Sequence, residues 1–93
     1  MGNAIVTFKV MPDSPDTDVE QIKEQALEIA RKHGAKGEMQ SKVEPVAFGL
    51  KQVLIYGMYD MDDEKDFDEV TAEMNKIDGV NVAEVANMDL AMG

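Results

Sequence analysis

The sequence has no cysteine and no tryptophan, and only three prolines and one histidine among its 93 residues. Without cysteine the chain has no disulfide framework, no cysteine zinc site and no thiol nucleophile. No apolar run approaches the ~20 residues that a membrane-spanning helix needs. The first residues lead directly into a β-branched segment, with no basic region followed by an apolar one. We therefore expect no signal peptide, no membrane partner and a cytoplasmic location.

Positive charge is also scarce, because 19 acidic side chains face nine lysines and arginines and give a net charge of −10. An acidic surface repels phosphate backbones, so we expect no direct nucleic-acid partner. Hydrophobic residues make up 44% of the chain, which favours a folded globule over a disordered chain. A chain of this length predicts a single domain over residues 1–93 with one modest core.

Alternating and helical apolar patterns predict four strands and two helices in the order βαββαβ. The expected strands are residues 4–11, 36–43, 50–59 and 80–88; the expected helices are residues 18–33 and the segment from Asp66 to Asp78; residues 89–93 would be a short tail. This order predicts the α+β class and a ferredoxin-like sandwich, in which two helices cover one face of a four-stranded antiparallel sheet.

Two details of these elements can be predicted from local chemistry. Thr17 and Glu20 have the spacing of a capping box, so we expect the Thr17 hydroxyl to cap the first helix. In the strand over residues 50–59, we expect Val53, Ile55 and Gly57 to face the helices, although the alternate residues are also apolar.

A turn with one large aromatic side chain precedes this strand. Phe48 lies beside Gly49, and the segment Pro45–Lys51 leads directly into the strand. Two alternatives remain open for Phe48: an exposed contact for another protein, or a cover for the open end of the core.

The acidic segment Asp60–Glu69 provides a different hypothesis, an ion or small-molecule sensor, because carboxylate oxygens bind divalent cations. It lacks the glycine and glutamate that an EF-hand loop starting at Asp60 would need, which favours a solvated loop. His33 and Arg31, the single residues of their kinds, lie near the end of the first helix, where cations stabilise the helix dipole. No set of residues predicts a catalytic centre, a bound cofactor or a metal ion.

The segment Pro45–Lys51, the strand after it, Asp62–Asp63 and the segment Asn87–Leu90 together resemble the exchange domain of elongation factor 1-beta, in its short archaeal form. The most specific pattern is Pro-[Val/Ile]-Gly-[Phe/Tyr]-Gly-[Ile/Leu]-Lys. Ala47 replaces its first glycine, whereas Phe48, Gly49 and Lys51 match. The resemblance covers nearly the whole chain.

The resemblance implies a guanine-nucleotide exchange factor for the GTPase elongation factor 1-alpha, which acts by binding and performs no covalent chemistry. Eukaryotic relatives place a lysine next to the C-terminus that reaches the magnesium site of the GTPase, whereas Leu90 stands at that position here. The residues expected to contact the partner are Pro45, Val46, Phe48, Gly49, Lys51, Met88, Asp89 and Leu90. By fold analogy, we expect Met88–Leu90 to lie at the same end of the sheet as the Phe48 turn.

Overall fold

The fold agrees with the predicted order of elements. A computed structural model describes residues 3–60 and 67–91, with the backbone alone at Glu38, Leu90 and Ala91. The elements are β1 (Asn3–Pro12), α1 (Val19–Lys32), β2 (Lys36–Pro45), the short 3-10 helix η1 (Ala47–Gly49), β3 (Lys51–Asp60), α2 (Phe67–Met74) and β4 (Val80–Ala91).

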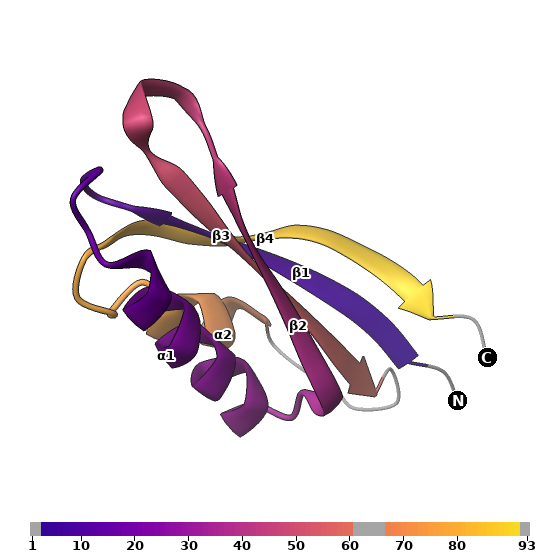
Figure 1. Cartoon of the computed structure of the whole chain (residues 1–93). Helices are drawn as coiled ribbons and strands as arrows, with labels where there is room; N and C mark the ends of the chain where they lie inside the picture. Colours follow the sequence, from indigo (N-terminus) through magenta and orange to yellow (C-terminus); the bar gives the residue numbers. More distant parts are fainter. Residues whose placement is uncertain (1–2, 61–66, 92–93) are drawn as a thin grey trace.

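The four strands form one antiparallel sheet in the order β2-β3-β1-β4. Both helices lie on the same side of this sheet, and the β2–β3 hairpin projects beyond the other strands (Figure 1). The structure thus confirms the α+β class and the ferredoxin-like sandwich. Since β3 and β4 both pair antiparallel with β1, they run parallel to each other.

The core lies between the sheet and the helices. Alternate residues of β1 and β3 are completely buried, including Phe8 on β1 and Val53 and Ile55 on β3. The predicted inward face of β3 is therefore confirmed, and Gly57 is also buried on it. A side chain at Gly57 would approach the Tyr59 ring, because an added Cβ would lie 3.0 Å from Cε2.

The start of α1 differs from the predicted capping box. Asp18 is the cap: its Oδ1 accepts hydrogen bonds from the backbone nitrogens of Glu20 at 3.1 Å and Gln21 at 3.3 Å. The Thr17 hydroxyl instead donates to Oδ1 of Asp13 at 3.1 Å. A carboxylate one residue later thus replaces the expected hydroxyl, and its negative charge also suits the helix N-terminus.

The second half of the chain departs from prediction at two element ends. Asp66, where the second helix was expected to begin, lies outside the described residues, and α2 ends at Met74, several residues before the expected Asp78. The strand β4 continues to Ala91, so residues 89–91 are not a tail. They pair with the first residues of β1, because β1 supplies a complete set of partners as far as Asn3.

Candidate functional site

The turn between β2 and β3 holds Phe48 in a left-handed backbone conformation, with φ 62° and ψ 31°. It is the one non-glycine residue with positive φ in the described part of the chain. Such a conformation is unfavourable by ~1–2 kcal/mol for a residue with a Cβ. Gly49 follows with a positive φ of 77°, so the chain makes two successive left-handed steps.

Hydrogen bonds on both sides fix this turn. The Val46 nitrogen donates to the Leu50 carbonyl oxygen at 2.8 Å, and the Leu50 nitrogen donates to the Ala47 carbonyl oxygen at 3.3 Å. Pro45 and Lys51 are the last paired residues of the two strands. Ala47 has no positive φ. The turn therefore does not require a glycine at this position, where the exchange-domain pattern has its first glycine.

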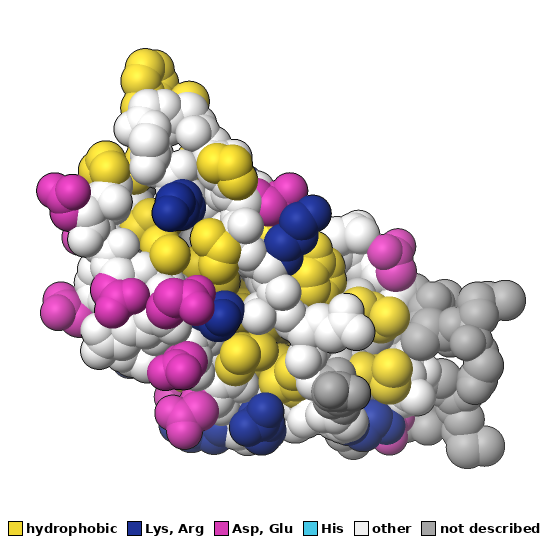
Figure 2. All heavy atoms as spheres, in the orientation of Figure 1, with side chains coloured by type: hydrophobic (Ala, Val, Ile, Leu, Met, Phe, Trp, Pro, Cys, Tyr) yellow, Lys and Arg dark blue, Asp and Glu magenta, His cyan; other side chains and the backbone are white. Residues whose placement is uncertain are grey.

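The side chain of Phe48 is 93% exposed, so the alternative in which it covers the core is wrong. In the space-filling view, hydrophobic side chains form the tip of the projecting hairpin (Figure 2). Pro45, Gly49 and Lys51 are also exposed, and Val46 is half-buried. An exposed aromatic ring on a hydrogen-bonded turn is pre-organised for contact, since little conformational freedom is lost when a partner covers it.

The residues Met88, Asp89 and Leu90 lie at the other end of the sheet, so the prediction that they lie beside the Phe48 turn is wrong. They pair with Val6, Ile5 and Ala4 of β1, whose neighbours on β3 are Gly57, Met58 and Tyr59. The Phe48 turn lies at the start of β3 and these residues lie near its end. The prediction assumed that β4 pairs antiparallel with β3, so that β4 would end beside the start of β3. The neighbour of β4 is instead β1, and β4 therefore ends beside the end of β3.

The two halves of the predicted contact set are thus separated by most of the length of β3, because Gly57–Tyr59 lie six to eight residue steps beyond Lys51, roughly 20–26 Å at ~3.3 Å each. Met88 and Asp89 also point to opposite faces, because they are consecutive in a strand. Met88 is 46% exposed on the helix-bearing face, beyond the part that the helices cover. Asp89 faces the open side and accepts a 2.8 Å hydrogen bond from Nδ2 of Asn87.

Only part of the acidic segment proposed as an ion site can be described. Residues 61–66 lie outside the described residues, whereas Asp60 ends β3 and Glu69 lies in the first turn of α2. In the described ranges, no group of three or more histidine, aspartate or glutamate side chains could hold a metal ion.

His33 has a carboxylate partner that the sequence did not indicate. It is the C-cap of α1, and its Nε2 contacts the Glu73 carboxylate of α2. Lys32 also donates to Glu73, at 2.8 Å. Lys32 and then His33 lower the pKa of Glu73 from its usual value. The contact joins the two helices across 40 residues of sequence, a separation that no local pattern could predict.

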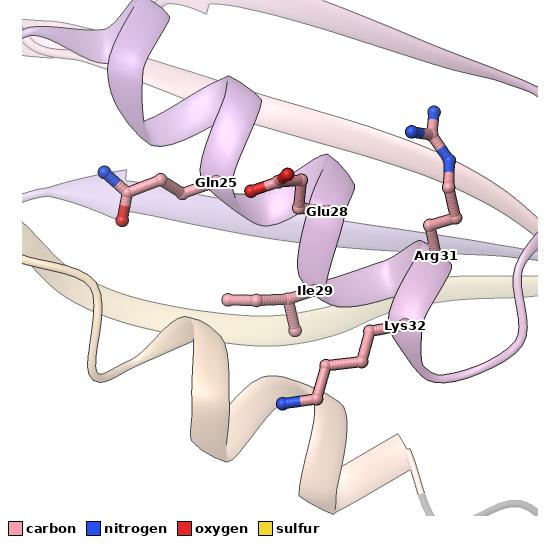
Figure 3. Close-up of a pocket in the computed structure, with 5 residues that line it drawn as sticks. All are labelled: Gln25, Glu28, Ile29, Arg31 and Lys32. Carbon is pink, nitrogen blue, oxygen red and sulfur yellow. The ribbon is translucent and has the colours of Figure 1, made fainter.

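A hollow of about 550 Å³ lies along α1 and is lined by Gln25, Glu28, Ile29, Arg31 and Lys32. Lys32 points toward α2 and Arg31 points away from it (Figure 3). The polar groups therefore do not converge on a common point. We interpret the hollow as part of the exposed surface of α1 and not as a ligand site.

Comparison with known proteins identifies the family. Residues 5–90 match the EF-1 guanine nucleotide exchange domain. The chain belongs to this family.

Curated relatives agree over nearly the full length. Elongation factor 1-beta of Methanococcus vannielii is 38% identical over 93 residues, which cover 97% of this chain and 99% of the relative. Elongation factor 1-beta of Methanocorpusculum labreanum is 34% identical over 89 residues, 96% of each chain. The function of this exchange-domain protein is therefore guanine nucleotide exchange on elongation factor 1 during translation. Neither helix of its described part has the length and apolar character that a bilayer crossing requires.

Proposed function

We propose that this chain acts as a single exchange-factor domain that speeds GDP release from elongation factor 1-alpha, with Phe48 as its principal contact. The observation that carries the proposal is the 93% exposure of Phe48 on a hydrogen-bonded turn. Backbone strain at an exposed side chain supports a role in function, because a smaller or more flexible residue would relieve it at no loss of core packing. Aromatic residues, phenylalanine among them, are also enriched in protein interfaces relative to the rest of the surface.

Exchange by this route needs no covalent step, so the proposed protein is a binding factor and not an enzyme. It favours the GTPase without nucleotide, and linkage then requires each ligand to weaken the other by the same factor. Each ~1.4 kcal/mol of preferential binding corresponds to a tenfold change in nucleotide affinity. The proposed contact set comprises two groups, the turn residues Pro45, Val46, Phe48, Gly49 and Lys51 and the β4 residues Met88, Asp89 and Leu90.

The proposed partner is a protein alone, in the cytoplasm, with no direct contact to nucleic acid or membrane. The net charge of −10 supports this, since phosphate groups would be repelled. The aromatic side chains of β3 agree: Tyr59 is buried toward the helices, whereas Tyr56 lies on the opposite face. They cannot form the paired stacking platform that sheet-based RNA binding uses.

The direct test follows release of a fluorescent GDP from elongation factor 1-alpha of the same organism. Catalytic amounts of the protein should accelerate release in the presence of excess unlabelled nucleotide. Raising GDP should also dissociate the complex of the two proteins, as linkage demands. An unchanged release rate with folded protein, verified by circular dichroism, would overturn the proposal.

A further inference from the structure

The face of the sheet away from the helices carries an aligned set of side chains, here called the open face. Strand register places its residues in rows across β2, β3, β1 and β4. The first row is Lys36, Met58, Ile5 and Asp89; the second is Gln40, Tyr56, Thr7 and Asn87; the third is Lys42, Leu54, Lys9 and Glu84. The strand β3 contributes an apolar side chain to every row, and β1 adds Ile5 to the first row.

The charges of the open face compensate one another. Lys9 lies 3.2 Å from Glu84, and Lys42 lies 3.4 Å from Glu44. Lys36 lies 3.9 Å from the Asp60 carboxylate and also reaches over β3 to donate to Oδ1 of Asn3 at 2.8 Å. In a chain of net charge −10, these pairs leave an apolar strip that is flanked by neutralised lysines. Such a surface suits a protein partner, since apolar centres with polar rims are typical of protein interfaces.

A hollow of about 240 Å³ lies on this face and is lined by Ile5, Gln40, Tyr56, Gly57 and Met58. Ile5 and Met58 are direct cross-strand partners, and each is 37% exposed. Next to it, β2 carries an irregularity between Lys36 and Gln40. Pockets for small-molecule ligands usually measure ~300–1,000 Å³, so this hollow matches one apolar side chain better than a free ligand.

The Phe48 turn alone is too small to form a stable interface with a protein partner. Stable protein interfaces use roughly 20–30 residues on each side, and the seven residues of the Phe48 turn are too few. The open face is continuous with that turn, because β3 begins at Lys51 and presents Leu54, Tyr56 and Met58 on this side. A partner that contacts Phe48 therefore needs further contact area, and the open face along β3 is the surface next to the turn.

We infer that the open face, from Leu54 to the Ile5–Met58 hollow, is a docking surface for the same GTPase, which inserts one apolar side chain into the hollow. The inference rests on the proposed function and extends it to the far end of the sheet. It also connects the Phe48 turn with Asp89 of the β4 group, because Asp89 lies in the same row as Ile5.

The test compares two variants that differ in the face they alter. Ile5→Gln removes an apolar side chain of 37% exposure from the open face, and Val85→Gln removes one of 36% exposure from the opposite face of β4, where Val85 pairs with the buried Phe8. Titration calorimetry with nucleotide-free elongation factor 1-alpha should show about tenfold weaker binding for Ile5→Gln. Val85→Gln should bind within about twofold of the unaltered protein.

Each outcome separates the inference from the proposed function. If the unaltered protein fails to bind the GTPase, the proposed function and the inference both fall. If Phe48→Ala weakens binding while Ile5→Gln and Val85→Gln bind equally well, the inference alone is overturned. Thermal melting accompanies each titration. Should Ile5→Gln unfold, Met58→Gln on the neighbouring strand provides the same comparison, and normal binding by it would overturn the inference.

Discussion

The side-chain amide of Asn75 makes both hydrogen bonds that a neighbouring strand would make to Ala83. Its Nδ2 donates to the Ala83 carbonyl oxygen at 3.0 Å, and its Oδ1 accepts from the Ala83 nitrogen at 2.9 Å. Ala83 lies in β4, an edge strand with no lysine, arginine or proline. Edge strands with free backbone groups promote pairing between molecules. Asn75 thus closes β4 at this point and ties the end of α2 to the sheet.

Replacing Asn75 by alanine should destabilise the protein and open its edge. The backbone groups of the buried Ala83 would lose their partners, which corresponds to about 1–3 kcal/mol of unfolding free energy. Urea unfolding measures the loss, and sedimentation measures the expected increase in self-association. Asn81→Ala is the control, because Asn81 is an exposed asparagine of the same strand. Equal stability of the two variants would show that the amide bridge contributes nothing.

Changing Phe48 to asparagine should abolish most of the exchange activity and leave the fold intact. Asparagine adopts left-handed backbone angles more readily than phenylalanine, so the turn should persist without its aromatic ring. Because Phe48 is 93% exposed, no core contact is lost. The measurement is the rate of fluorescent GDP release together with a thermal melt.

Phe48→Tyr is the matched variant, since it keeps the aromatic ring on the same turn. It should retain most of the exchange rate. If Phe48→Asn exchanges as fast as Phe48→Tyr, the ring does not contact the GTPase and the proposed site is wrong.

Acid should weaken the contact between the two helices at Glu73. Lys32 and His33 lower the pKa of this carboxyl below its usual value of 4.5. A lowered pKa in the folded state contributes stability that is present above pH ~4.5 and is lost as the pH falls through the folded value. The melting temperature of the unaltered protein should therefore exceed that of Glu73→Gln near pH 6, and the difference should shrink below pH ~4.

Glu69→Gln supplies the control for this comparison, because Glu69 is an exposed carboxylate of the same helix. It should differ little from the unaltered protein across the same pH range. A difference between Glu73→Gln and the unaltered protein that stays constant down to pH ~3 would contradict the assignment.

The sequence predicted the elements well because their apolar periods are strong. The inward face of β3 was predicted correctly, although the sequence favours it weakly: the period of two fits either face, and Leu54, Tyr56 and Met58 are also apolar. The exposure of Phe48 was not predictable, because an apolar ring near a strand end can fold either way. Its left-handed conformation depends on hydrogen bonds that close the turn around it, and residue types alone do not specify them.

Contacts between residues far apart in the chain could not be predicted from the sequence for a related reason. The contacts of Glu73 with Lys32 and His33, and of Asn75 with Ala83, depend on how helices lie against strands and not on local spacing. The end of the sheet that holds Met88–Leu90 was predicted wrongly, because the result depends on which strand lies next to β4. If β4 paired with β3 instead of β1, Met88–Leu90 would lie at the opposite end of the sheet, and no residue in β4 identifies which strand it pairs with.

Alkaline pH should weaken the fold through Tyr59. Its hydroxyl donates to the Ala30 carbonyl oxygen at 3.1 Å, and burial raises the pKa of Tyr59 from 10.0 to about 12. A raised pKa in the folded state means that stability is fully present below pH ~10 and is lost as the pH rises toward ~12. Tyr59→Phe should lose about 0.5–1.5 kcal/mol of unfolding free energy at neutral pH, but its unfolding free energy should decline less steeply above pH 10.

Urea unfolding at pH 7, 10 and 11.5 checks both effects, with Tyr56→Phe on the open face as the control. Parallel declines for Tyr59→Phe and Tyr56→Phe would show that the buried hydroxyl does not govern alkaline stability.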